Sequence, residues 1–300
     1  MIEQDRLRRF LFEDAPLRGH WVRLTDTWRD AREFQHLPTP VMRLLGEALA
    51  ATALLAGSLK FTGTLTLQLR DGSGLVSMLI AQATSDLTLR GVAQVEEAAI
   101  VGTETFAELM GVGQLVITVE QGGGSSWQGI VPLDGNTLAA CLERYFEVSE
   151  QVPTRIVLGA DAQHAAGLLL QKLPAPAALG EAQEARLLDM WEEAAALLAT
   201  VRANELLAAE PRELLERVFS MHDLRLFDAE RVCFACHCGE ERVAAMLRAL
   251  GREEVESILV EQGSVTVTCE FCRRPYVFDA VDAARLFVPV ATIHPPESLN

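Results

Sequence analysis

Arg231-Val-Cys-Phe-Ala-Cys-His-Cys238 and Cys269-Glu-Phe-Cys272 decide the fold of the C-terminal part of this 300-residue chain. Two close pairs of thiols, separated by a segment long enough to fold, form the ligand set of a tetrahedral zinc site. The first pair is unusual because only His237 separates its two cysteines, whereas zinc fingers usually place about two to four residues there. The sequence predicts one zinc ion, bound by Cys236, Cys238, Cys269 and Cys272.

Other cysteines and a histidine could compete for this site. Cys233 forms a Cys-x-x-Cys with Cys236 and is a possible extra thiol, but its Val-Cys-Phe context is strand-like and favours a half-buried spectator. His237 lies between two ligands on a tight turn, where neighbouring side chains point apart, so we expect it to be exposed. Cys141 lies on an apolar helix face, which is typical of a buried free thiol.

Composition limits the classes of function. A formal net charge of −16 disfavours a nucleic-acid binder or a protein that docks on an anionic membrane, and 49% hydrophobic residues can build a substantial core. The N-terminus lacks the apolar stretch of a signal peptide, which favours a cytoplasmic location. In that reducing compartment, clustered cysteines more often bind metal or react than form permanent disulfides. The apolar residues 41–59 include Arg43 and Glu47 and predict a buried helix, not a membrane span.

Residues 1–178 are predicted to form an α+β core domain with a largely antiparallel sheet. Residues 64–70 alternate polar and apolar side chains, which is the pattern of a half-buried strand. Turn residues 71–74 and 122–126 join strands into hairpins. Further strands are expected at 75–80, 87–95, 114–120, 127–131, 155–158 and 167–173, and helices at 27–35, 39–59 and 136–149.

Three further segments follow. A proline-rich break at 173–177 marks the end of the core domain. Residues 179–230 are predicted to be an acidic helical linker whose apolar face packs on the core. Residues 231–288 are predicted to be a small zinc-binding domain, with helices at 240–250 and 253–260 and a hairpin around the second cysteine pair. A domain of this size would need the bound metal to stabilise its fold. Residues 289–300 are expected to be a flexible tail.

The cysteine spacing leaves several functions open. The site could be purely structural, as in a zinc-ribbon interaction or nucleic-acid-binding protein, or it could be a redox switch, since thiolates also react with oxidants. A thiol oxidoreductase using Cys269 and Cys272 is disfavoured because the pair lies between strands and not at the start of a helix. No phosphate-binding glycine loop or nucleophile elbow is present, so we expect no enzyme activity.

Several quoted motifs resemble one known family. The spacing Cys236-x-Cys238 … Cys269-x-x-Cys272 is similar to the cysteine signature of the 33 kDa chaperonin family, the redox-regulated heat-shock holdases of bacteria. The segments at 9–13, 59–61, 137–155 and 258–278 are similar to that family as well. The resemblance covers nearly the whole chain, to about residue 287.

The resemblance implies an ATP-independent chaperone that zinc keeps inactive. In the family, the reduced protein is a monomer that binds one zinc ion through the four cysteines. Oxidants acting under unfolding conditions form the disulfides Cys236–Cys238 and Cys269–Cys272 and release zinc. The linker then unfolds, and the activated homodimer protects unfolding client proteins during heat and oxidative stress. Cys233 departs from the family pattern, and a disulfide between Cys233 and Cys236 remains chemically reasonable.

Overall fold

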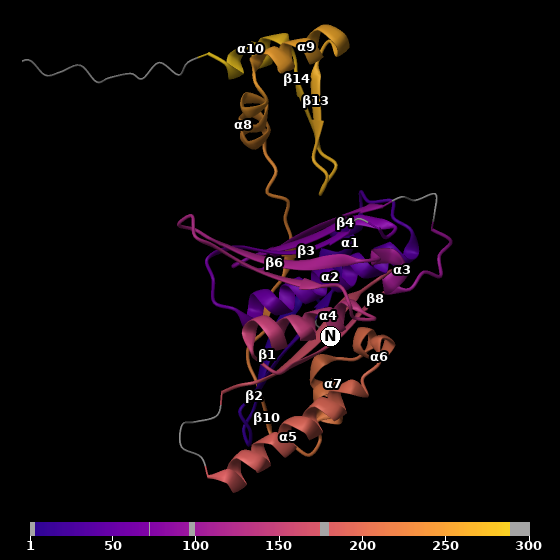
Figure 1. Cartoon of the computed structure of the whole chain (residues 1–300), viewed down its shortest axis with the longest axis vertical. Helices are drawn as coiled ribbons and strands as arrows, with labels where there is room; N and C mark the ends of the chain where they lie inside the picture. The colour runs from indigo at the N-terminus through magenta and orange to yellow at the C-terminus, as the bar shows by residue number, and fades with distance from the viewer. Residues whose placement is uncertain (1–3, 72, 96–99, 175–179, 289–300) are drawn as a thin grey trace, which may run out of the picture. The chain divides into compact units, whose positions relative to one another are not determined.

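The computed structural model describes residues 4–71, 73–95, 100–174 and 180–288. The chain divides into two compact units, Met1–Ala235 and Cys236–Asn300. The first contains two large sheets, and the second a two-stranded hairpin with three helices (Figure 1). The predicted α+β class with antiparallel sheets is confirmed, although the first unit has two sheets where the sequence suggested one.

The first sheet has the order β10-β1-β2-β9-β8, with β11 also paired to β1, and all its pairs are antiparallel. Side chains alternate between its two faces, so Trp21 and Val22 on β2 enter different clusters. Its strands are β1 (Arg6–Phe12), β2 (Leu17–Leu24), β8 (Thr154–Ala160), β9 (Ala165–Lys172), β10 (Leu224–Leu226) and β11 (Glu230–Arg231).

The second sheet has the order β12-β5-β4-β3-β6-β7. Its pairs are antiparallel except β12 with β5, which is parallel. The inner face is apolar because every second residue of β3 is leucine: Leu65, Leu67 and Leu69 are fully buried. Its strands are β3 (Gly63–Asp71), β4 (Val76–Thr84), β5 (Thr88–Val95), β6 (Gly113–Gln121), β7 (Ser126–Pro132) and β12 (Cys233–Phe234).

Helix α2 (Thr39–Ser58) lies between the two sheets, and its leucines and alanines join both inner faces in one core (Figure 1). By length and apolar composition α2 could cross a membrane, but 78% of its apolar window is buried inside the first unit. Shorter elements complete this unit: α1 (Asp26–Arg32), α3 (Phe106–Met110), α4 (Leu138–Tyr145) and the π-helical turn η2 (Phe146–Glu150).

The linker helices are α5 (Glu181–Ala199), α6 (Ala203–Ala208) and α7 (Pro211–Val218). They cover the outer face of the first sheet, and this contact forms a second apolar cluster. On the sheet side the cluster is aromatic, with Phe10, Phe12 and Trp21, and on the helix side it includes Trp191 and Leu214. The first unit therefore has four layers: second sheet, α2, first sheet and linker helices.

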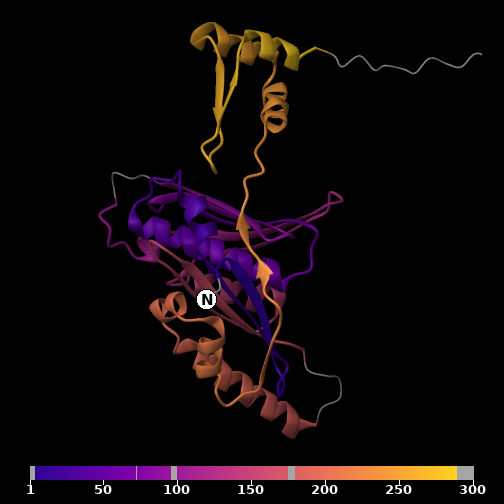
Figure 2. The same ribbon diagram turned by 180° about the vertical axis from the view of Figure 1, so that it is seen from behind.

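Residues 230–235, which we call the strap, run along the edges of both sheets (Figure 2). Arg231 pairs with β1, and the backbone N–H groups of Cys233 and Ala235 donate to the carbonyls of Leu87, just before β5, and of Leu89 in β5. The sequence placed the start of the zinc-binding domain at Arg231. The strap nevertheless belongs to the first unit because its backbone hydrogen bonds complete the edges of that unit's sheets.

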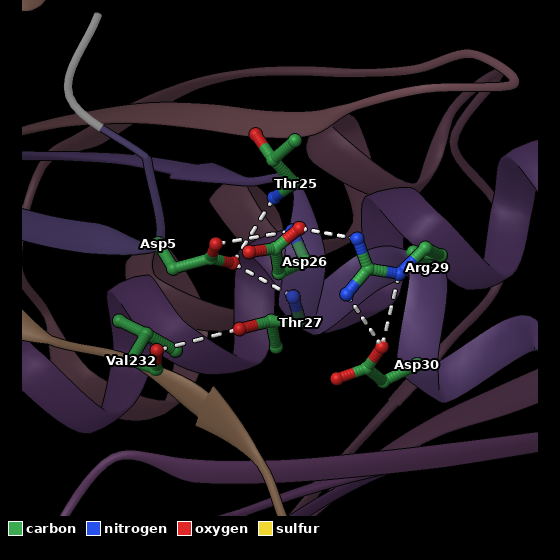
Figure 3. Close-up of polar contacts among 7 residues, drawn as sticks. All are labelled: Asp5, Thr25, Asp26, Thr27, Arg29, Asp30 and Val232. Atoms are coloured by element: carbon green, nitrogen blue, oxygen red, sulfur yellow. Dashed lines mark hydrogen bonds and ion pairs between the residues drawn. The ribbon is translucent and has the colours of Figure 1, made fainter.

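Asp5 fixes the strap to the start of α1 (Figure 3). Its carboxylate accepts hydrogen bonds from the backbone N–H groups of Thr25, Asp26 and Thr27 at 3.0, 3.0 and 2.8 Å. Its carbonyl oxygen accepts one from the N–H of Val232 at 2.9 Å, and the Thr27 hydroxyl donates to the Val232 carbonyl at 3.3 Å. One acidic residue therefore joins the chain's N-terminal segment, α1 and the strap.

The second unit is small. Helices α8 (Glu240–Leu250), α9 (Arg252–Gln262) and α10 (Ala280–Leu286) surround a hairpin of β13 (Val265–Thr268) and β14 (Pro275–Phe278). Seven buried apolar residues form its core: Val243, Ala244, Leu247, Val255, Val265, Phe278 and Ala283. The predicted tail, 289–300, lies outside the described residues.

Candidate metal centre

Two turns carry the four cysteines of the second unit. Cys236 and Cys238 lie in the extended segment just before α8, whose N-cap is Gly239. Cys269 and Cys272 lie in the turn between β13 and β14. That turn is closed by hydrogen bonds from the Cys269 N–H to the Arg274 carbonyl and from the Arg273 N–H to the Cys269 carbonyl. Arg273 takes a left-handed φ of 54°, which bends the chain so that both thiols lie on one side.

The four sulfur atoms form one cluster. All lie within 4.8 Å of one another, with Cys236 Sγ 3.6 Å from Cys269 Sγ and Cys238 Sγ 3.4 Å from Cys272 Sγ. Four sulfurs bound tetrahedrally at about 2.3 Å from a zinc ion would lie about 3.8 Å apart. The cysteines are free and not disulfide-bonded. The donor set therefore has both the chemistry and the dimensions of a metal site, and these four residues could hold one ion.

The hydroxyl of Tyr276 adds a polar contact to this cluster. It donates a hydrogen bond to Cys238 Sγ at 3.1 Å. Although partial burial opposes ionisation, this bond and those from the neighbouring thiols lower the pKa of Cys238 to about 7. Burial and the hydrogen bonds of the cluster raise the pKa of Cys272 to about 12. Cys238 therefore loses its proton more readily than Cys272 when the cluster is protonated.

Among the described residues, the sulfur cluster includes none of the remaining candidates. Cys233 is on β12 in the first unit, half-buried, and its N–H donates to the Leu87 carbonyl. His237 is exposed, as predicted. Cys141 is fully buried in the main core, as predicted, and burial raises the pKa of its thiol.

Sequence reasoning missed a buried arginine that bonds to the linker helices. Arg23 lies on β2, two positions after Trp21, on the face that the linker helices cover, and it is only 1% exposed. Its guanidinium reaches Leu207, Ala209 and Glu210. The two-residue period of a strand could have shown that a charged side chain lies on an aromatic face there.

Comparison with known proteins gives consistent results. A family model described as Hsp33 protein matches residues 5–279. A 33 kDa chaperonin of Nitrosococcus oceani is 45% identical over 287 residues, covering 96% of each chain. One from Shewanella sp. (strain MR-4) is 42% identical over 284 residues, covering 95% of this chain and 96% of the relative. The crystal structure of a 33 kDa chaperonin (heat shock protein 33 homolog) from Thermotoga maritima superposes with a TM-score of 0.81 at 25% identity, covering 94% of this chain and 97% of that chain.

Proposed function

Because this chain belongs to the Hsp33 protein family, a family of chaperones, we propose that it is an ATP-independent holdase with a thiol–zinc redox switch. The observation that carries the proposal is the cluster of four sulfur atoms in the second unit. In the reduced state Cys236, Cys238, Cys269 and Cys272 hold one zinc ion. The bound ion keeps the thiolates deprotonated and links the two turns that carry them.

The second unit depends on this link for its fold. Its core has only seven buried apolar residues, and a single core in a domain of this size rarely supplies more than about 3–5 kcal/mol. The free energy of metal binding is then a large part of the folding free energy. Losing the thiolates as ligands therefore unfolds the unit, and we propose this as the sensing step.

Oxidation removes the ligands. Two thiolates, one hydrogen peroxide molecule and two protons give one disulfide and two water molecules, so each pair loses two electrons to the oxidant. From the family resemblance we propose the disulfides Cys236–Cys238 and Cys269–Cys272. The sulfur contacts at 3.6 and 3.4 Å join cysteines of different pairs. All four sulfur atoms lie within 4.8 Å of one another, so the two sulfurs of each motif are also close enough to pair after local movement.

The surface for clients is proposed to be the face that the linker helices cover. Phe10, Phe12 and Trp21 are buried there against α5–α7. If these helices detach under mild unfolding conditions, a large aromatic surface enters water, and such surfaces bind other apolar segments. The active form would then associate with unfolding proteins and with a second copy of the chain. We further propose a cytoplasmic location, a reduced monomer, and no role for nucleic acid, membranes or catalysis.

The proposal is tested by measuring aggregation of a heat-unfolding client by light scattering. Reduced, zinc-loaded protein should not protect the client, whereas protein treated with peroxide at mildly elevated temperature should. Zinc release, followed with a chromogenic chelator, should accompany activation, and peptide mapping should find the two disulfides. If the oxidised, zinc-free protein leaves client aggregation unchanged, the proposed function is wrong. The double variant Cys269→Ser/Cys272→Ser is the control that cannot form the second disulfide.

A further inference from the structure

Arg23 is a buried charge at the contact between the first sheet and the linker helices. Only 2% of its side chain is exposed, and arginine is rarely buried so completely without partners. It lies beside Trp21, with the guanidinium carbon 5.7 Å from the ring centroid. The charge therefore sits within the aromatic surface that the linker helices cover, where hydrogen bonds that it donates to protein acceptors replace much of its hydration.

Three of its acceptors lie at one corner of the linker. Nη1 donates to the carbonyl oxygens of Leu207 and Ala209 at 3.3 and 3.0 Å, and Nη2 lies 3.2 Å from Glu210 Oε1. Leu207 is in the last turn of α6 and Ala209 is its C-cap, while Glu210 is the N-cap of α7. A cation at the carbonyl end of a helix interacts favourably with the helix dipole. One side chain of the core thus holds the end of one linker helix and the start of the next.

Apolar packing around the α6–α7 corner is tight on one side of α6 and incomplete beside it. At one point α6 sits very close to β8, because a Cβ added to Gly159 would lie 2.9 Å from the Cβ of Ala203. Beside this contact a cavity of about 500 Å³ separates α6 from α2 and the β8–β9 turn. Its lining includes the polar side chains of Glu47, His164 and Asn204. Helix α6 is therefore not fully packed on that side, and a polar anchor matters more for its attachment.

We propose that Arg23 is a positioning residue that pins the α6–α7 corner to the core and makes its release all-or-none. A partial opening that withdraws one acceptor leaves the charge buried with fewer partners, which costs far more than losing a surface ion pair. Full opening exposes the guanidinium to water, which restores its hydration. Intermediate openings are thus disfavoured, and the corner is either held or free. The link to client protection rests on the proposed function, but the pin itself does not.

Amide hydrogen exchange of the reduced, zinc-loaded full chain tests the pin without oxidant or client. The first variant, Arg23→Met, removes the charge and keeps a long side chain. The second, Glu210→Gln, removes the carboxylate charge and keeps the shape of the glutamate side chain. Arg212→Met is the matched control, because Arg212 is on α7 but its ion pair with Glu216 is exposed. Amides of α6 and α7 should exchange at least about tenfold faster in Arg23→Met, since each charge-assisted hydrogen bond is worth about a factor of ten or more. Amides of β3 and β4, and the zinc content, should not change.

A double-mutant cycle separates pinning from a general loss of packing. The effect of Glu210→Gln should largely disappear when Arg23 is already methionine, because the two side chains act through one contact. Arg23→Lys keeps the charge but lacks the two terminal nitrogens with which the guanidinium donates to several acceptors, so it should give intermediate exchange rates. Unchanged exchange of α6 and α7 in Arg23→Met would overturn the proposal, as would equal acceleration in Arg212→Met. If Arg23→Met does not fold, Glu210→Gln alone tests the proposal. Exchange rates of α6 and α7 equal to those of the wild type in Glu210→Gln would then overturn it.

Discussion

The first unit buries α2 between two sheets and then buries the outer face of one sheet under the linker helices, whereas the second unit surrounds one hairpin with three helices. The first has two extensive apolar clusters. The second has seven buried apolar residues and a cluster of four sulfurs. In the proposed function, one chain combines a domain held by packing with a domain held by metal ligands that an oxidant can remove.

Removing the metal should produce the largest difference between the two units. Treating reduced protein with a strong chelator should unfold the second unit completely, because its small core does not offset the entropy of ordering the chain. Exchange protection in α8 and α9 should be lost, while the strands of the first unit stay protected. Circular dichroism and exchange mass spectrometry before and after chelation measure this. Readdition of zinc under reducing conditions is the control, and protection of α8 in metal-free protein would contradict the prediction.

The same substitution in each core should have different consequences. Leu49 and Leu247 are both buried, at 0% and 1% exposure, and truncating either to alanine should cost about 2–5 kcal/mol. In Leu49→Ala the first unit should remain folded with a lower melting temperature. In Leu247→Ala the loss is comparable to the whole stability of the second unit's core, so zinc affinity should fall by at least about tenfold.

Zinc competition titrations and thermal unfolding of both variants provide the measurement. Leu49→Ala serves as the matched control for Leu247→Ala, since its zinc affinity should equal that of the wild type. Equal zinc affinity in Leu247→Ala would show that the core of the second unit does not limit metal binding.

A half-buried carboxylate makes part of the first unit sensitive to pH. Burial raises the pKa of Glu47 to about 7, with Arg43 opposing it, and Asp161 and His164 share the same cavity. Because its pKa is raised, Glu47 binds a proton more tightly in the folded state than in the unfolded state. The stabilisation of the folded state by this proton is complete below about pH 4.5 and is lost as the pH rises to 7. Above that, the wild type carries the cost of a buried charge, which for such a pKa difference is up to about 3 kcal/mol.

Glu47→Gln should therefore stabilise the first unit at pH 8 and change little at pH 4.5. Urea unfolding of both proteins across this range gives the difference in the free energy of unfolding. Burial also lowers the pKa of His20 to about 4, so the first unit loses stability as the pH falls below 6.5. His20 is present in both proteins, and its contribution cancels in the difference. A difference that does not vary with pH would show that Glu47 does not titrate in this window.

The features that the sequence predicted depend on residues close together in the chain, whereas the features that it missed join residues far apart. The strand at 64–70 and the hairpin around Cys269 and Cys272 depend on neighbouring residues, so period-two alternation and turn chemistry were sufficient. The pairing of β12 with β5 joins residues far apart in the sequence, as Cys233 lies opposite Thr88. No local pattern encodes such a pairing, so the sequence analysis grouped the strap with the cysteine module that follows it. The acceptors of Arg23 were missed for the same reason.

Substituting Cys233 should have the smallest effect. Its backbone completes the edge of β5 in the first unit, and the four clustered sulfurs already provide a full tetrahedral set. Cys233→Ser should bind one zinc ion per chain with wild-type affinity, whereas Cys236→Ser should lose most of its affinity. Metal analysis and competition titration of both variants make the comparison. Reduced zinc affinity in Cys233→Ser would show that the strap supplies a ligand and that the two units are coupled through the metal.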